Sequence, residues 1–277
     1  MCIRLLNIEN ISEENLEDAL NICSCNRSFA PINDPILVKA RDFKRQWFLE
    51  MLEKYGPCMK IAYLDGKAVA QILFYPEEVM PYIHNPREDT IYLKCIFNNS
   101  PDTRGKGVGN ALMKSLIEES QKGLDCLGGR PSQFIVTRPF PHEGDLPLTD
   151  FYEKYGFRQG QQEMYLEIKG KYAPMKIPEL SPLPEDRGRT ILLYNANCEW
   201  GYYYAMTARD LIHSKHPHHP VEIFDSWKEP EEYKKRGGGW MLIAAGILVN
   251  AQVPENPFIF WLDRDAFLRN VEEAMRK

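Results

Sequence analysis

A glycine-rich turn at residues 104–110, with the sequence RGKGVGN, has residue types and a spacing that could bind an anion. It follows a stretch typical of a strand, residues 90–97, and opens a segment with helical periodicity, residues 110–121. Glycines let the backbone bend and let a ligand approach closely, and the first amides of a helix lie at the positive end of its dipole. The sequence therefore predicts a phosphate or pyrophosphate site at this turn.

Two common nucleotide-binding motifs do not fit this turn. The P-loop pattern G-x-x-x-x-G-K-[ST] does not occur in the chain. The dinucleotide pattern G-x-G-x-x-G fails as well, because the sixth position counted from Gly105 is Asn110. The turn matches R-x-x-G-x-G instead, at Arg104, Gly107 and Gly109. Taken alone, such a turn could still be purely structural.

A second motif lies further along the chain, at residues 151–157, with the sequence FYEKYGF. Its pattern F-Y-x-x-x-G-F predicts a short helix that ends at Gly156 and is followed by a strand. Gly156 can adopt the left-handed conformation that closes a helix, and Phe157 then returns to the core. The two motifs, in this order, resemble those of the GCN5-related N-acetyltransferases, the GNAT family. The resemblance covers residues 1–168.

The resemblance implies both a fold and an activity. Family members have a mixed central sheet flanked by helices and transfer an acetyl group from acetyl-coenzyme A to a primary amine. Helices are expected at 12–22, 41–55, 110–121 and 149–155, and strands at 60–64, 68–74, 90–97, 132–137 and 162–168. The order ααβββαβαβ agrees with that family. The cofactor-binding residues that the resemblance implies are Ile96, Phe97, Asn98, Asn99, Arg104, Gly105, Lys106, Gly107, Val108, Gly109 and Asn110.

Tyr152 matches the family tyrosine that protonates the departing thiolate. A phenol with a pKa of about 10 stays protonated at neutral pH and can give its proton to a thiolate whose conjugate acid has a pKa of about 8.5. The alternative is that Tyr152 is only a packed aromatic residue. No general base is assigned, because Glu77, Glu78, Glu88 and Asp89 are expected to be solvated surface carboxylates.

The side of the site that would bind the amine departs from the family pattern. Lys94 stands on the strand where an acid could serve as a base, and Asp145 stands where the family often has asparagine. His142 and Glu143 lie in a proline-rich loop and are further candidates for the base. We expect the acceptor, a small-molecule or peptide amine, to be individual to this protein.

Composition excludes several classes of protein. The chain of 277 residues carries a net charge of −5, which argues against a general nucleic-acid binder. No apolar run approaches the roughly 20 residues that span a bilayer, and the N-terminus lacks the apolar core of a signal peptide. The seven scattered cysteines fit reduced thiols. We therefore expect a cytoplasmic protein with neither nucleic-acid nor membrane partners.

The rest of the chain predicts a linker and a second domain. Residues 169–189 contain Pro174, Pro178, Pro182 and Pro184 and are expected to form an extended linker. Beyond it, strands are expected at 190–194, 221–224, 246–250 and 258–261, and helices at 201–213, 229–235 and 265–275. This order is typical of a small thioredoxin-like domain. The expected α/β protein thus has a GNAT domain (1–168), a linker (169–189) and a thioredoxin-like domain (190–277).

The second domain carries one candidate for a reactive thiol, Cys198. It lies in the predicted turn from strand to helix, where thioredoxin-like folds carry C-x-x-C and where a helix N-terminus lowers the pKa of a thiol. Gly201 replaces the second cysteine, so the motif itself cannot form a disulfide. A GNAT unit followed by such a domain resembles proteins with a YoaP-like C-terminal domain. The alternative for Cys198 is a buried or inert thiol.

A cluster of histidines, in the sequence HSKHPHH at residues 213–219, is not predicted to bind metal. Prolines stiffen the loop, and no cysteine or aspartate stands at a metal-finger spacing. The sequence leaves one alternative to the enzyme open: an acyl-coenzyme A-binding sensor without turnover. It would use Cys198 or the histidines to detect thiols or metal.

Overall fold

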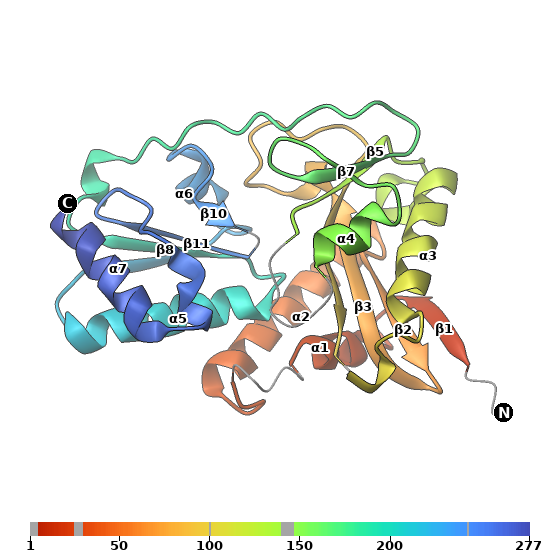
Figure 1. Ribbon diagram of the computed structural model, residues 1–277, viewed down its shortest axis with the longest axis horizontal. Coiled ribbons are helices and arrows are strands. Elements are labelled where there is room, and N and C mark those ends of the chain that lie inside the picture. The colour runs from red at the N-terminus through yellow and green to blue at the C-terminus, as the bar shows by residue number, and fades with distance from the viewer. Residues whose placement is uncertain (1–4, 25–29, 100, 140–146, 243) are drawn as a thin grey trace. The chain divides into compact units, whose positions relative to one another are not determined.

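A mixed seven-stranded sheet forms the centre of the first half of the chain (Figure 1). The structure is a computed structural model that describes residues 5–24, 30–99, 101–139, 147–242 and 244–277. The strands lie in the order β1-β2-β3-β4-β5-β7-β6, and β4 and β5 are the parallel pair among antiparallel neighbours. Their bounds are β1 (Leu6–Asn10), β2 (Met59–Leu64), β3 (Lys67–Pro76), β4 (Thr90–Asn98), β5 (Phe134–Thr137), β6 (Arg158–Gln159) and β7 (Met164–Glu167).

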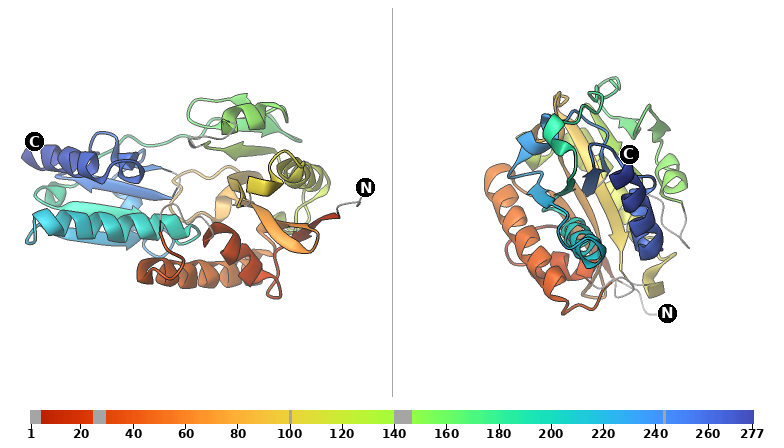
Figure 2. Two further views of the ribbon diagram at one scale, coloured as in Figure 1. Left: turned by 60° about the horizontal axis from the view of Figure 1, so that its bottom comes forward. Right: turned by 90° about the vertical axis from the view of Figure 1, so that its left-hand side faces the viewer.

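Helices cover both faces of this sheet (Figure 2). They are α1 (Leu16–Ser24), α2 (Pro35–Tyr55), α3 (Val108–Lys122) and α4 (Leu148–Glu153), with short 3-10 turns at Glu77–Val79, Pro101–Thr103 and Asp125–Leu127. Buried residues of α3 and α4 share one core with alternate residues of the central strands, such as Ile72 and Ile91. On the other face, the ring of Trp47 in α2 lies 5.6 Å from that of Tyr75 in β3. The predicted fold class, a mixed sheet flanked by helices together with a second, smaller sheet, is confirmed.

Local signals predicted the hairpin between β2 and β3 correctly. Asp65 and Gly66 both have positive φ angles, 52° and 76°, as a two-residue hairpin turn requires. The strand β1 was missed, so the observed order begins with a strand rather than with two helices. Its sequence LNIEN is short and mostly polar, so its strand propensity is weak. The strand is stabilised by its pairing with β2 instead.

Helix α2 begins six residues earlier than the predicted start at residue 41, at Pro35. Asp34 caps it, because its Oδ1 accepts a hydrogen bond of 2.8 Å from the amide of Ile36. Proline suits the first helical position, since its missing N–H would have no partner there. The dipeptide Asp34-Pro35 was therefore a start signal that the periodicity alone did not reveal. Within the described ranges, no helix is long and apolar enough to cross a membrane.

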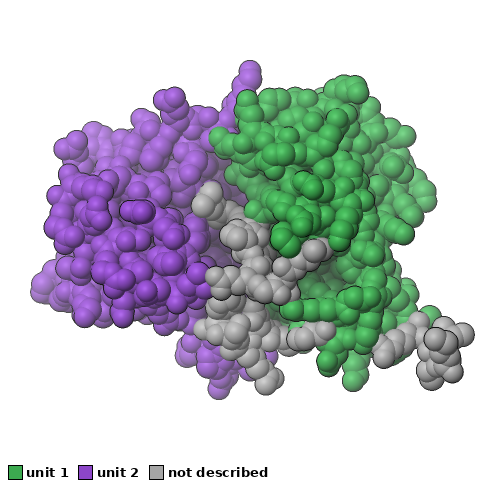
Figure 3. Space-filling view, viewed as in Figure 1, with its two compact units in different colours: residues 1–26, 45–80, 86–175 green, residues 27–44, 81–85, 176–277 purple. Residues whose placement is uncertain are grey.

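The chain divides into two compact units (Figure 3). The first contains residues 1–26, 45–80 and 86–175, and the second contains residues 27–44, 81–85 and 176–277. The second unit includes the start of α2 because Phe43 packs there, with ring centroids 6.3 Å from Tyr194 and 5.1 Å from Tyr202.

A four-stranded sheet in the order β10-β11-β8-β9 forms the centre of the second unit. Its elements are β8 (Thr190–Tyr194), α5 (Glu199–Lys215), β9 (Val221–Asp225), α6 (Pro230–Lys234), β10 (Met241–Leu242), β11 (Ala245–Val249) and α7 (Arg264–Arg276). β8 and β9 are parallel, whereas β11 is antiparallel to β8. Helices α5 and α7 share one core, in which the rings of Tyr204 and Phe267 lie 6.1 Å apart.

The predicted strand at 258–261 is wrong. Pro257–Trp261 form a 3-10 helix after Asn256, whose φ of 39° turns the chain. The aromatic run suggested a strand, but its rings pack around a tight turn: those of Phe260 and Trp261 are 4.9 Å apart and nearly perpendicular. The sheet gains the short β10 instead, which the sequence did not predict.

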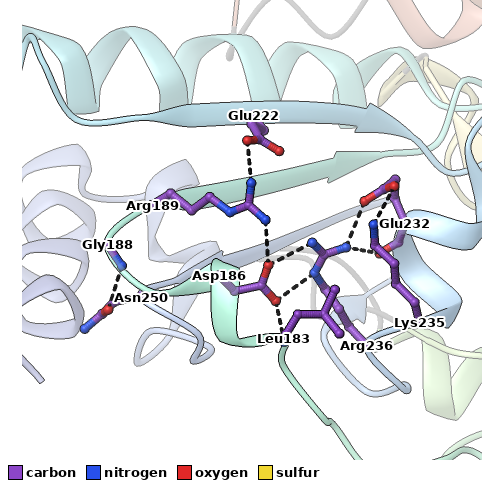
Figure 4. A network of polar contacts seen from close by, with 9 residues as sticks. All are labelled: Leu183, Asp186, Gly188, Arg189, Glu222, Glu232, Lys235, Arg236 and Asn250. Carbon is purple, nitrogen blue, oxygen red and sulfur yellow. Dashed lines mark hydrogen bonds and ion pairs between the residues drawn. The ribbon is translucent and has the colours of Figure 1, made fainter.

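Residues 176–189, the end of the predicted linker, belong to the second unit and include a 3-10 helix at Pro184–Asp186 (Figure 4). Asp186 accepts two hydrogen bonds of 2.8 Å from Arg236, and the two side chains are 0% and 1% exposed. Gly237 explains why the segment can come so close, because a Cβ there would stand 1.9 Å from the carbonyl oxygen of Glu179. The proline-rich segment thus packs closely against the glycines that follow α6, residues 237–239.

Breaking the buried pair with Asp186→Asn should destabilise the second unit by about 3–5 kcal/mol, because Arg236 would keep its buried charge without a carboxylate. Urea unfolding followed by tryptophan fluorescence measures this. Glu232→Gln is the control: Glu232 also binds Arg236 but is 24% exposed, so about 1 kcal/mol or less is expected. Equal effects of the two variants would contradict a dominant role for Asp186.

The same pair should make stability fall in acid. Burial disfavours the charged Asp186, but the hydrogen bonds from Arg236 and from the amide of Leu183 outweigh it and lower the pKa of the carboxyl. A lowered folded-state pKa stabilises the protein above the pKa of the unfolded chain, about 4, and this contribution is lost as the pH falls through the lowered value. The Asp186→Asn variant should lose less stability than the wild type over that range.

Candidate active site

The glycine turn before α3 presents backbone amides that no bond within the helix satisfies. Gly105 and Gly107 have left-handed φ angles of 73° and 79°, and Gly107 precedes the helix with no side chain to cap it. The first bond into the helix is from the amide of Ala111 to the carbonyl of Gly107, at 2.9 Å. The amides of residues 108–110 therefore have no partner within the helix. A Cβ at Gly105 or Gly107 would meet nothing within 4 Å, so the turn is open to an anion.

Strands β4 and β5 part just before this turn. Their parallel pairing runs from Thr90 opposite Phe134 to Leu93 opposite Thr137. β4 then continues to Asn98, paired with β3 alone among the described residues. The register with β3 also shifts at this point, since Leu93 and Cys95 face adjacent residues of β3 and Lys94 is the extra residue of a bulge. Residues 95–98 thus keep one backbone edge to which an extended ligand could bond.

Tyr152 lies at the point where the two strands part. Its side chain is 1% exposed. Burial raises the pKa of its phenol, the hydroxyl of Thr137 at the end of β5 opposes this shift, and Cys95 and Tyr92 of β4 raise the pKa further. The phenol is therefore a protonated group surrounded by the ends of β5 and β4. This environment suits a proton donor to a group held between the strands.

Helix α4, which carries Tyr152, is fixed against the glycine turn by two contacts. The ring of Phe151 lies 3.6 Å from the position that a Cβ of Gly109 would occupy. The hydroxyl of Tyr155 donates a hydrogen bond of 2.6 Å to Oδ1 of Asn110. The distance between the phenol and the turn is thus set by one side chain of α4 and one of the turn that follows this helix. The sequence analysis did not predict this bond.

The other residues predicted to bind the cofactor lie along the same path. Ile96 packs against the core beside α3. Oδ1 of Asn98 accepts a hydrogen bond of 2.8 Å from Thr103, and the amide of Asn99 donates to the carbonyl of Val69 at 3.1 Å, which extends the pairing with β3. Phe97, at the end of β4, is half-buried, Val108 is buried, and Arg104 and Lys106 are exposed in the turn.

The expectation that Glu77 is a solvated carboxylate is wrong. Its side chain is 0% exposed, and Arg87 binds it through Nε at 2.7 Å and Nη2 at 2.6 Å. Arg87 also pairs with the buried Glu163. Of the other candidates for the base, Glu78 accepts a hydrogen bond from the amide of Asp89, which itself pairs with Arg130.

The remaining candidates are placed as follows. Glu88 is exposed, and Lys94, which replaces an acid on β4, is buried. His142, Glu143 and Asp145 lie outside the described residues. The general base is therefore still unassigned.

Cys198 is the N-cap residue of α5 and is partly exposed, and its amide donates to the carbonyl of Asn195 at 3.0 Å. The histidines at the opposite end of α5 lie close to other protein groups: His216 lies 3.1 Å from Glu272, and His219 lies 2.9 Å from Thr190. Among the described residues, no group of three or more histidine, cysteine, aspartate or glutamate side chains could hold a metal ion.

Residues 26–157 match the model of the acetyltransferase (GNAT) family. The match spans both the glycine turn and the motif around Tyr152 and supports acetyl transfer as the general activity of this part of the chain. No curated protein matches the chain.

Three solved structures illustrate the likeness to GNAT proteins. The ribosomal-protein-S18-alanine N-acetyltransferase of Escherichia coli is 16% identical, with a TM-score of 0.40, over 61% of this chain and 97% of its own. A GNAT family acetyltransferase of Brucella melitensis, in complex with acetyl-CoA, is 17% identical, with a TM-score of 0.40, over 62% and 92%. An N-acetyltransferase of Staphylococcus aureus Mu50 is 17% identical, with a TM-score of 0.40, over 60% and 99%.

Proposed function

We propose that this protein transfers an acetyl group from acetyl-coenzyme A to a primary amine. Three features carry the proposal. They are the amides at the start of α3 in the glycine turn, the part of β4 that continues beyond its pairing with β5, and the phenol of Tyr152 beside the ends of that pairing. The family match of residues 26–157 supports it.

The residues of the turn fit the pyrophosphate of coenzyme A. The left-handed Gly105 and Gly107 leave open space where side chains would stand, and the amides of residues 108–110 are the donors. Arg104 and Lys106 add positive charge without having to touch the phosphates. The backbone of residues 96–99 would bond the pantetheine arm in the manner of a strand. When bound, acetyl-coenzyme A supplies an activated acetyl thioester.

Tyr152 would serve as the general acid. As the amine nitrogen bonds to the acetyl carbon and the bond from carbon to sulfur breaks, Tyr152 gives its phenolic proton to the departing sulfur. The proton lost by the amine passes to a base or to solvent. A phenol with its ordinary pKa of about 10 is already protonated at neutral pH, which this role requires, and burial raises the pKa of Tyr152 further.

Isothermal titration calorimetry with acetyl-coenzyme A, followed by measurement of coenzyme A release with a panel of primary amines, tests the proposal. Micromolar binding and release that depends on an amine are the expected results. Absence of binding would overturn the proposal as a whole. If acetyl-coenzyme A binds but no amine causes release of coenzyme A, the cofactor site stands and the proposed transferase activity is wrong.

Enlarging Gly109 should separate α4 from the turn. In Gly109→Leu the new side chain would collide with Phe151, and a displacement of the phenol by about 1 Å can cost about 100-fold in rate. Gly109→Ala is the control, because its Cβ would lie 3.6 Å from the ring, an ordinary contact. Steady-state rates of coenzyme A release measure the difference. An alanine variant as slow as the leucine variant would show that the effect does not come from the position of α4.

For the second unit we keep the proposal of a thioredoxin-like, YoaP-like domain over residues 190–277. The parallel pair β8 and β9, joined through α5, and the place of Cys198 at the start of α5 support it. A cytoplasmic location is proposed on the scattered cysteines. No observation favours the sensor over the transferase.

A further inference from the structure

Arg138 stands directly after Thr137, the last residue of β5, and thus at the point where β4 and β5 part. Other buried or partly buried arginines of this protein have a carboxylate partner. They include Arg87, Arg189 and Arg236. Arg138 forms no ion pair with a carboxylate of the described residues, and its side chain is only half-exposed to solvent.

The surroundings of the Arg138 guanidinium are polar only in part. Nη2 lies 3.5 Å from the sulfur of Met175, a weak acceptor, and Nε is buried without a hydrogen-bond partner. A guanidinium always carries its charge, and a buried donor without an acceptor costs free energy. Such a group is stabilised when an anion binds to it, and a carboxylate matches its two-pronged geometry best.

Two buried acids of the first unit are already engaged elsewhere. Glu77 and Glu163 both bind Arg87, and their charges act on Tyr92 together with the opposite charge of Arg138. Burial raises the pKa of Tyr92 to about 12, and Arg138 is the group that opposes this shift. Tyr92 in turn acts on the phenol of Tyr152. Tyr92 therefore interacts electrostatically with both Arg138 and the proposed acid, Tyr152.

We propose that Arg138 binds the carboxylate of the amine acceptor, and that the acceptor is a small amine of the amino-acid class. This inference rests on the proposed acetyltransferase function and deepens it by naming the class of acceptor. In an amino acid the amine and the carboxylate are joined through one carbon, so a guanidinium beside the reaction site can hold one while the other reacts. Arg138 is a residue for binding and specificity and takes no part in proton transfer.

Matched pairs of acceptors separate the carboxylate from the rest of the molecule. Each pair consists of an L-amino acid and the amine that remains when its carboxylate is lost, such as phenylalanine with phenethylamine and alanine with ethylamine. Initial rates of coenzyme A release give kcat and KM for each member. For the wild type, we expect kcat/KM to be about 10- to 100-fold higher for the member with the carboxylate, the range of one charge-assisted pair.

Arg138→Gln should remove this preference by raising KM for the amino acid about 10- to 100-fold. Its kcat, the rate with the decarboxylated amine and the Kd of acetyl-coenzyme A should stay unchanged. Arg138→Lys should keep part of the preference, because it keeps the charge but loses the two-pronged geometry. Arg158→Gln is the control, since it removes an exposed arginine paired with Glu167 on the outer strands.

The possible failures can be told apart. If the wild type binds acetyl-coenzyme A but does not prefer the amino acid of any pair, or acetylates none of them, the proposal for Arg138 is wrong and the cofactor site stands. If Arg138→Gln slows both members of a pair equally, Arg138 has a structural role, and a lowered melting temperature would accompany it. If acetyl-coenzyme A does not bind, the proposed function itself fails.

Discussion

Replacing Tyr152 by phenylalanine is expected to lower kcat for acetyl transfer by about 100- to 10,000-fold, the range that a positioned general acid contributes. The variant loses a hydroxyl and keeps the ring, so the contacts with Phe151 and Phe157, at ring distances of 5.8 and 5.4 Å, should survive. The Kd of acetyl-coenzyme A should stay within a factor of two or so of the wild type, because the turn that would hold the cofactor does not involve the phenol. Steady-state kinetics and calorimetry on one protein preparation give both quantities.

Tyr165→Phe is the matched control for the loss of a tyrosine hydroxyl. Tyr165 lies on β7, which pairs with β5 on the side opposite to β4, and its ring stacks on Tyr172 at 3.8 Å. Its removal should leave kcat unchanged. A Tyr152→Phe variant that binds the cofactor and turns over at the wild-type rate would show that Tyr152 is only a packed aromatic residue, the alternative that the sequence left open.

The parts of the site that the sequence predicted depend on local signals. The left-handed φ angles of Gly105 and Gly107 favour glycine, and the helix that follows shows its period within a few residues. The same holds for the hairpin at Asp65 and Gly66. Such features can be read from short windows, because their physical cause lies within the window.

The parts that the sequence missed depend on partners far apart in the chain. Glu77 is buried because Arg87 and, through it, Glu163 complete one network, and no local pattern joins these three positions. The bond from Tyr155 to Asn110 is of the same kind. Burial of a charge is decided by its tertiary partners, so carboxylates that propensity places on the surface can lie in the core.

The secondary structure predicted from the sequence is wrong where tertiary packing outweighs local propensity. β1 is ordered by its pairing with β2, although its sequence is short and polar. The aromatic residues of Pro257–Trp261 have strand propensity, but their rings fill a core against α5 and α7. Strand propensity measures the fit to a pleated surface, and here no neighbouring strand offers one.

Introducing a negative charge at the glycine turn with Gly107→Glu is expected to weaken acetyl-coenzyme A binding by at least about 100-fold. The added side chain would enter the space that the pyrophosphate needs, and two like charges brought together cost several kcal/mol, where about 1.4 kcal/mol corresponds to tenfold. Calorimetry of wild type and variant under the same ionic strength measures the loss. It should be smaller at high salt, because salt screens the repulsion at this exposed turn.

The variant also forces a non-glycine residue into a left-handed conformation, which costs about 1–2 kcal/mol of stability wherever it occurs. Gly66→Glu controls for that strain: Gly66 has a φ of 76° against 79° at Gly107, a Cβ at either position would meet nothing within 4 Å, and the added charge is the same. Both variants should therefore lose similar stability, and only Gly107→Glu should lose binding. If both variants lose the same affinity for acetyl-coenzyme A, the loss comes from backbone strain that disturbs the fold. The pyrophosphate would then be expected to bind away from the glycine turn.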